Sequence, residues 1–274
     1  MIKIKWIVLI LLIILITLFF LVNTFNHKKT YTNYLALGDS IAEGYALKDK
    51  NKRYSKIVQN NYKIEDNNFI DLSKSGMTAQ ELAVNLNKPE YIDSIKRSDL
   101  ITISIGSNEL LSVLKQIVQE FVLSNPTSNF NTLSNTLLKE LQSPNSQKAF
   151  QEGVATYQKS WNDILEKIKV INPNATIVAT EFYNPYYNLE GIGNIADVYI
   201  KQLNTILHNK SENGKVYYIA NIYEDFKNSK VNCTNVNTTS LTYNSINLST
   251  LDPHPNVNGH KIMADKIIEV LSAN

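Results

Sequence analysis

Residues 34–41 read YLALGDSI, a short apolar run followed by a glycine, an aspartate and a serine. Because the run is short, apolar and bounded by turn residues, it predicts a buried β-strand over Tyr34–Leu37. Gly38 lets the backbone turn sharply where this strand ends. The side chain of Ser40 is then exposed at the carboxyl end of the strand, at the start of a helical turn, as a nucleophile requires. An ordinary turn is the alternative interpretation of this segment taken alone.

The alternation of short apolar runs with longer amphipathic runs continues along the whole chain. Short, β-branched or aromatic runs predict four further strands, at Phe69–Leu72, Leu100–Ile105, Thr176–Thr180 and Val216–Ala220. Runs with helical periodicity predict helices at Tyr54–Asn60, Ala79–Asn85, Leu110–Val122, Ala149–Lys169, Ile195–Lys210 and Gly259–Leu271. This alternation predicts an α/β fold with a parallel sheet covered by helices on both faces. In such folds the ligand binds beyond the carboxyl ends of the strands.

Two stretches depart from the alternation. Ser124–Ser146 is rich in Ser and Asn with scattered Leu, and it predicts an inserted flap or helical excursion. Tyr223–Thr250 is polar and predicts a long loop, and loops of that length inside compact domains tend to be functional or mobile. The length of 274 residues suits one α/β domain or at most two small ones. We expect one domain over residues 31–274, with the insertion near residues 124–146.

The first thirty residues are predicted to form a separate membrane anchor with a short linker. After two lysines, the apolar run from Trp6 to Val22 contains a single hydroxyl residue, and Ile4–Phe25 has roughly the 20-residue length that spans a bilayer core. No cleavage site of small residues follows the run, so an uncleaved signal-anchor is favoured over a secretory signal peptide. We therefore expect one N-terminal transmembrane helix in the cell membrane, with the body on the extracytoplasmic side.

Two further segments follow the second and third predicted strands. Ser73–Thr78 contains Gly76, whose N–H group can be offered to a developing oxyanion without obstruction by a side chain. Ile105–Glu109 contains Asn108, whose side-chain amide can donate to the same oxyanion, a contribution worth about 10²–10³ in rate. Each residue also has a simpler interpretation, Gly76 as a turn residue and Asn108 as the cap of the helix predicted from Leu110.

A fourth segment, Leu251-Asp252-Pro253-His254-Pro255, lies in the loop before the last helix. His254 is the best candidate for a general base, because prolines stiffen its loop on both sides and a carboxylate lies nearby. The other three histidines fall beside the apolar N-terminal run, within an amphipathic helix, and at the start of the last helix, where His260 suits a packing or capping role. A metal site of Asp252, His254 and His260 is the alternative, but it lacks a further strong ligand.

Together and in this order, the four segments resemble the four sequence blocks of the SGNH/GDSL hydrolase family. The resemblance extends from about Tyr34 to the last helix, and the chain looks like a bacterial, membrane-anchored member. It implies a flavodoxin-like three-layer α/β/α sandwich with a parallel sheet, without a metal or an organic cofactor. It matches Ser40 to the nucleophile and His254 to the base, and it places the oxyanion hole at the N–H group of Ser40, at Gly76 and at Asn108.

The resemblance implies a serine-dependent carboxylic ester hydrolase of the lipase/acylhydrolase type, which works through an acyl-enzyme. Two positions depart from the family pattern. The third block usually ends in Asp, where this chain has Glu109, at a position without a catalytic role. The acid usually stands three residues before the histidine, where this chain has Leu251. Either Asp252 or a backbone carbonyl must then orient His254. We favour Asp252, because Pro253 biases it towards an extended conformation. In that conformation side chains two positions apart share a face, so Asp252 and His254 point the same way.

Composition narrows the remaining classes of function. The formal net charge is +2 and the body has no dense Lys/Arg run, so nucleic-acid binding is unsupported. The single cysteine, Cys233, excludes an internal disulfide and a thiolate metal cluster, and its polar surroundings suggest an ordinary surface or loop residue. An acyltransferase and an inactive glycan-binding module of the same fold in the cell envelope stay open as alternatives. The substrate stays open among small esters, lipids and O-acylated glycans. The aromatic residues after the fourth strand are candidates to line its site: Phe182, Tyr183, Tyr186 and Tyr187.

Overall fold

The computed structural model describes residues 17, 29–124, 130–236 and 252–273. Its centre is a sheet of five parallel strands in the order β2-β1-β3-β4-β5, the flavodoxin-like order. The predicted parallel α/β sheet is therefore confirmed. The strands are β1 (Tyr34–Gly38), β2 (Phe69–Asp71), β3 (Leu100–Ser104), β4 (Thr176–Thr180) and β5 (Tyr218–Ala220).

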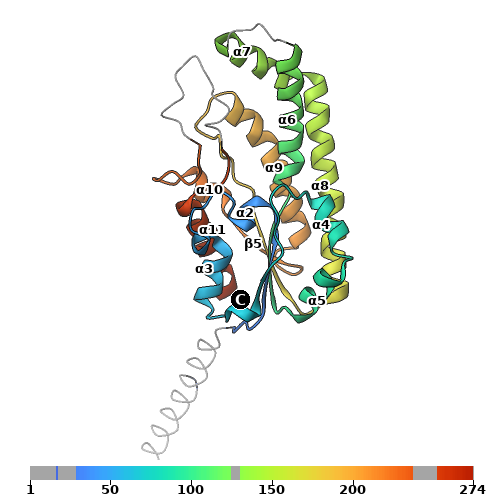
Figure 1. The fold of residues 1–274 in the computed structure, drawn as a ribbon, viewed down its shortest axis with the longest axis vertical. Coiled ribbons are helices and arrows are strands. Elements are labelled where there is room, and N and C mark those ends of the chain that lie inside the picture. The colour runs from blue at the N-terminus through green and yellow to red at the C-terminus, as the bar shows by residue number, and fades with distance from the viewer. Residues whose placement is uncertain (1–16, 18–28, 125–129, 237–251, 274) are drawn as a thin grey trace, which may run out of the picture.

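Alternate residues of each strand face two separate hydrophobic cores. Leu35 and Leu37 of β1 pack into one core, whereas Tyr34 and Ala36 pack into the other. Helices cover both faces, so the molecule has three layers (Figure 1). The first core is closed by α4 (Ala79–Asn85), α5 (Pro89–Arg97), α8 (Pro144–Ile171) and α9 (Ile192–Ser211), and the second by α3 (Tyr54–Asn61) and α11 (Val257–Ser272).

Several helices differ from those expected. The sequence interpretation missed α5 and began α8 five residues late, although both helices start with a proline, whose missing N–H costs nothing at the first helical position. The predicted long loop Tyr223–Thr250 is wrong in its first part, because α10 (Tyr223–Lys227) lies there. Residues 237–251 of that loop lie outside the described residues.

The stretch expected to form a flap or helical excursion contains α7 (Phe130–Leu141). It lies between α6 (Ser107–Ser124) and α8 and packs against both. Figure 1 shows α6 and α8 side by side and rising past the ends of the strands, with α7 at their far end. This excursion leaves the sheet on the same side as the carboxyl ends of the strands, where the candidate catalytic residues lie.

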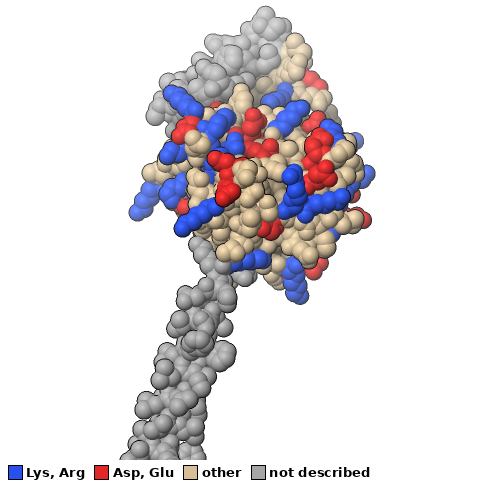
Figure 2. All heavy atoms as spheres, turned by 60° about the horizontal axis from the view of Figure 1, so that its bottom comes forward, with Lys and Arg blue, Asp and Glu red and all other residues tan. Residues whose placement is uncertain are grey.

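The other end of the sheet holds the first residues of the described body. Figure 2 looks onto this end, where basic and acidic side chains are interspersed. Among the described residues, no helix combines the length and the apolar character needed to cross a membrane. The predicted anchor over residues 1–30 falls almost entirely on residues outside the described part.

Candidate active site

The turn after β1 depends on Gly38. Its φ angle is +151°, and a Cβ atom there would lie 2.2 Å from the carbonyl oxygen of Ser104 on β3, so a side chain does not fit. The N–H group of Asp39 donates to the same oxygen at 3.1 Å, and the Asp39 carboxyl accepts from the N–H of Ile41 at 2.9 Å. Ser40 is thereby fixed as the first residue of the short helix α2 (Ser40–Glu43), beyond the carboxyl ends of β1 and β3.

Ser40, His254 and Asp252 form a continuous hydrogen-bonded chain. His254 Nε2 lies 2.9 Å from Ser40 Oγ, and His254 Nδ1 lies 2.5 Å from Asp252 Oδ1. The same carboxylate oxygen accepts the backbone N–H of His254 at 3.1 Å, so it holds both the ring and the backbone. Leu251, where the family usually has its acid, lies outside the described residues. The carboxylate beside Nδ1 is thus the one two positions before the histidine.

The loop that carries His254 is supported by its neighbours. The Tyr183 hydroxyl donates to the Pro253 carbonyl at 2.8 Å, and the Asn235 N–H donates to the His254 carbonyl at 2.9 Å. On the solvent side, the ring of Tyr45 lies 5.1 Å from the imidazole, measured between ring centroids. These contacts hold the imidazole in one orientation relative to Ser40.

Gly76 and Asn108 lie beside Ser40 on one cleft. The φ angle of Gly76 is +80°, and no atom lies within 4 Å of the position where its Cβ would stand, so its backbone is open to this cleft. The Asn108 side-chain amide donates to the Met77 carbonyl at 2.9 Å. A primary amide has two N–H donors, so a second one is left for a ligand in the cleft. Since α6 begins at Ser107, Asn108 lies inside its first turn and does not cap a helix from Leu110.

Two carboxylates that the sequence interpretation left without a role connect these loops. Glu43 Oε2 accepts from both the N–H group of Ser75, at 2.7 Å, and its hydroxyl, at 2.5 Å. Glu109 Oε1 accepts the N–H group of Ala79, in the first turn of α4, at 2.6 Å. Each glutamate lies close in sequence to a candidate catalytic residue, and this proximity is the feature of the sequence that could have pointed to it. Their partners, however, are 32 and 30 positions away.

A comparison with known families decides the classification. The GDSL-like lipase/acylhydrolase family matches residues 36–262. The chain belongs to this family. Spore germination lipase LipC of Bacillus licheniformis is 23% identical over 242 residues, which cover 85% of this chain and 93% of that protein. The family supports an ester hydrolase activity.

Two solved structures share the fold of this GDSL-like protein. The lipase Lip_vut3 from a goat rumen metagenome has a TM-score of 0.63 at 22% identity, covering 87% of this chain and 97% of its own. Phospholipase A1 from Streptomyces albidoflavus NA297 also has a TM-score of 0.63, at 18% identity, covering 88% of this chain and 100% of its own. At these identities the likeness establishes the fold of the GDSL-like chain.

Two carboxyl groups are buried beneath the site of this GDSL-like protein. Burial raises the pKa of Asp39 to about 7, and the nearby Glu109 carboxylate acts in the same direction. Burial also raises the pKa of Glu109, although the N–H group of Ala79 opposes this. Asp39 is therefore protonated in the folded protein at mildly acidic pH, while one of its oxygens still accepts from Ile41.

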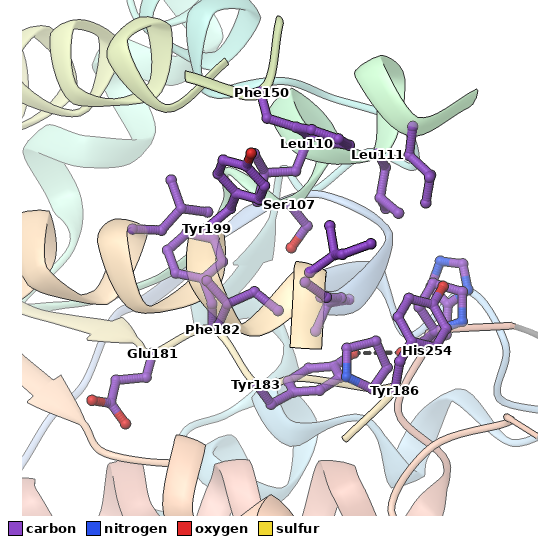
Figure 3. A pocket seen from close by; sticks show the side chains of 18 of the residues that line it. Ser107, Leu110, Leu111, Phe150, Glu181, Phe182, Tyr183, Tyr186, Tyr199 and His254 are labelled. Atoms are coloured by element: carbon purple, nitrogen blue, oxygen red, sulfur yellow. Dashed lines mark hydrogen bonds between the residues drawn. The ribbon is translucent and has the colours of Figure 1, made fainter. Parts of the chain in front are cut away.

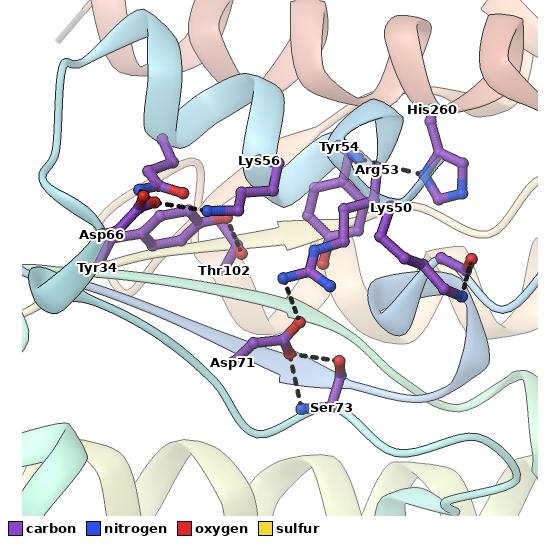
Figure 4. A network of polar contacts seen from close by, with 12 residues as sticks. Tyr34, Lys50, Arg53, Tyr54, Lys56, Asp66, Asp71, Ser73, Thr102 and His260 are labelled. Carbon is purple, nitrogen blue, oxygen red and sulfur yellow. Dashed lines mark hydrogen bonds and ion pairs between the residues drawn. The ribbon is translucent and has the colours of Figure 1, made fainter. Parts of the chain in front are cut away.

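His260 has the packing role expected of it. Its ring is buried, and its Nδ1 accepts the backbone N–H of Tyr54 at 3.3 Å within the polar network of Figure 4. Burial lowers the pKa of His260 to about 3, so the ring is neutral at ordinary pH. The alternative metal site with Asp252 and His254 gains no support, because no group of three or more His, Cys, Asp or Glu side chains is placed to hold a metal within the described ranges.

Cys233 is buried in the second core, which corrects the expectation of a surface residue. The segment around it packs closely on α11, since a Cβ at Gly259 would lie 2.2 Å from the Cys233 carbonyl oxygen.

A second hollow meets the cleft at Ser40 and His254. It is an apolar cavity between the carboxyl ends of the strands and helices α6, α8 and α9 (Figure 3). Of the aromatic residues that follow β4, Phe182, Tyr183 and Tyr186 line this cavity, whereas Tyr187 is exposed. The site of this GDSL-like chain therefore combines an open cleft that holds the candidate oxyanion donors with a buried apolar cavity.

Proposed function

We propose that the protein is a carboxylic ester hydrolase that works through an acyl-enzyme on Ser40, with His254 as general base and Asp252 as the group that orients it. One observation carries this proposal: His254 Nε2 is 2.9 Å from Ser40 Oγ while His254 Nδ1 is on the Asp252 carboxylate. With Nδ1–H bonded to the carboxylate, the Nε2 lone pair faces the serine hydroxyl and can take its proton.

The first half-reaction forms the acyl-enzyme. Ser40 Oγ attacks the ester carbonyl carbon as its proton passes to His254 Nε2, and the carbonyl oxygen becomes an oxyanion. When the tetrahedral intermediate collapses, the C–O bond to the alcohol breaks and His254 returns the proton to the departing alkoxide. Asp252 stabilises the imidazolium that exists between these two transfers.

The second half-reaction frees the acyl group. A water molecule attacks the acyl-enzyme as His254 takes one of its protons, and the bond to Ser40 Oγ then breaks as His254 returns that proton to the serine. The products are a carboxylic acid and the regenerated hydroxyl. In both halves the N–H groups of Ser40 and Gly76 and the free N–H of Asn108 are the donors for the oxyanion, and such preorganised donors are often the largest single contribution to catalysis.

The test is hydrolysis of p-nitrophenyl esters by the wild type, by Ser40→Ala and by the control Ser112→Ala, whose serine is exposed on α6. Ser40→Ala should lose nearly all activity, with at most about 10³-fold catalysis over water remaining from the oxyanion donors. Ser112→Ala should match the wild type. Equal activity of Ser40→Ala and wild type would contradict the proposal.

Product analysis with an added acceptor alcohol separates hydrolysis from acyl transfer, because a transferase yields a new ester in place of the free acid.

A further inference from the structure

The apolar cavity beside Ser40 reaches further from the serine than an acetyl group needs. It extends from Ser40 and His254 to the stacked rings of Phe150 and Tyr199, whose centroids are 4.7 Å apart. Figure 3 shows these two rings on the side of the cavity away from His254. One wall comes from Leu110 and other leucines of α6, the first helix of the excursion. The helical insertion thus helps to enclose a deep cavity at the nucleophile.

The lining of this cavity suits an apolar occupant. Among the described residues that line the cavity, Glu181 is the one acidic or basic residue other than His254. Its carboxylate is already engaged, with Oε1 at 2.7 Å from His208 Nε2 and Oε2 accepting the Tyr223 N–H at 3.0 Å. Figure 3 shows this carboxylate directed away from the other lining side chains. A polar ligand would lose its hydration here without finding enough partners, whereas a hydrocarbon chain gains from burial.

We propose that this cavity binds the acyl chain of the substrate and that the preferred esters carry acyl chains longer than acetyl, of about four to six carbon atoms; this rests on the proposed function. The acyl group stays attached to Ser40 between the two half-reactions, so it needs a lasting, dry site. The alcohol must leave in between, and the cleft on the other side of Ser40 suits its departure, because that cleft is larger and carries polar side chains such as Lys115 and Gln119.

The size of the cavity sets the chain length. Its volume is about 120 Å³. A water-sized group takes a share of about 30 Å³, and a methylene is of similar size, so the cavity holds about four such groups beyond the reacting carbonyl. The preferred acyl chain therefore has roughly four to six carbon atoms.

The experiment measures kcat/KM of the full chain for p-nitrophenyl esters from acetyl to hexadecanoyl, with active sites counted by a small methyl fluorophosphonate. We expect kcat/KM to rise roughly fourfold per added methylene until the cavity is full, and to level off or fall beyond about six carbons. The blocking variant is Ala196→Phe, since Ala196 lines the cavity from α9. The matched control is Ala155→Phe, the same change at an exposed position of α8.

Ala196→Phe should lose at least about tenfold in kcat/KM for the hexanoyl ester, which corresponds to fewer than two buried methylenes. Its losses in acetyl hydrolysis and in fluorophosphonate labelling should be much smaller, and Ala155→Phe should match the wild type throughout. A wild-type optimum at acetyl, or an equal loss for acetyl and hexanoyl esters in Ala196→Phe, would overturn the acyl-chain proposal while labelling at Ser40 still upheld the proposed function. Absence of both labelling and hydrolysis in the wild type would instead contradict the proposed function itself.

Discussion

Asp252 stands two residues before His254, one position closer than the family's usual acid, and its carboxylate lies 2.5 Å from His254 Nδ1. Because this contact selects the tautomer in which Nε2 faces Ser40, Asp252→Asn should lower kcat by about 10⁴ with the fold intact. Steady-state kinetics on p-nitrophenyl esters measures this directly. A loss smaller than about tenfold would mean that a Ser–His dyad suffices and that Asp252 is structural.

Asp39, next to Ser40, links the stability of the fold to pH. Its pKa is about 7 in the folded protein against an ordinary value of 3.8, because it is fully buried. Between these two values the folded chain binds more protons than the unfolded chain. The stability that comes from keeping Asp39 protonated is therefore fully present below pH 3.8 and is lost as the pH rises to about 7.

Asp39→Asn keeps an oxygen that can accept the Ile41 N–H and removes the titration. Relative to the wild type, the variant should gain on the order of a few kcal/mol in the free energy of unfolding above pH 7 and little near pH 4. Urea denaturation of the body from Tyr31 onward, at a series of pH values, gives this difference. If the wild-type and variant curves run parallel across that range, Asp39 does not titrate as described.

At the scale of elements, the site is assembled from turns that follow β1, β2 and β3 and are tied together by glutamates. Glu43 of α2 binds Ser75, the residue before Gly76, through two hydrogen bonds. Since this clamp fixes the residue next to Gly76, the proposed oxyanion donor, we expect Glu43 to act as a positioning residue. Its loss should act on the transition state more than on substrate binding.

Glu43→Ala should lower kcat roughly ten- to hundredfold with a smaller effect on KM, somewhat less than the removal of a complete oxyanion donor. Glu43→Gln keeps one acceptor oxygen and should recover part of the rate. Kinetics for both variants, together with their melting temperatures, separate positioning from stability. If kcat of Glu43→Ala stays at the wild-type value in folded protein, the clamp has no role in catalysis.

The elements themselves were predictable where local pattern decides them. The five strands follow from short apolar runs rich in β-branched or aromatic residues, because β1, β3 and β4 are buried on both faces and the edge strand β2 is half-buried. By contrast, the sequence does not predict α5, which is short and largely polar, or α10, which has only five residues. Both helices are stabilised by the packing of a few side chains, such as Tyr91, Ile95 and Phe226, and sequence periodicity does not reveal this packing.

For the whole molecule, the order of four short segments along the chain was enough to nominate Ser40, Gly76, Asn108 and His254. Each segment has a local signature at the end of a strand or before a helix. The partners of Glu43 and Glu109 and the enclosed cavity could not be predicted in this way. They depend on side chains 30 or more positions apart and on how the insertion packs, which only the tertiary structure specifies.

The described body begins at the end of the sheet opposite the site. Lys29 Nζ donates to Thr176 Oγ1, at the first residue of β4, at 3.0 Å, whereas Ser40 lies beyond the last residue of β1 (Figure 1). We propose that the apolar run over residues 4–25 holds the enzyme in the cell membrane with its body outside the cytoplasm. The site would then face away from the point of attachment.

Cell fractionation tests this tether. The protein should stay in the membrane fraction after washes with high salt and carbonate, because about 20 apolar residues suffice to span a bilayer. Protease added to intact spheroplasts should remove the body. A soluble extracellular form that begins near Asn26 would overturn the proposal.

The central claim is that His254 activates Ser40 as a nucleophile, and covalent labelling tests it most directly. The wild-type protein, treated with a fluorophosphonate and digested, should carry one adduct, located by mass spectrometry on the peptide with Ser40. Ser40→Ala should carry none, and His254→Ala should label far more slowly. Labelling of Ser40→Ala to the wild-type extent, or an adduct on another serine of the wild type, would contradict the account.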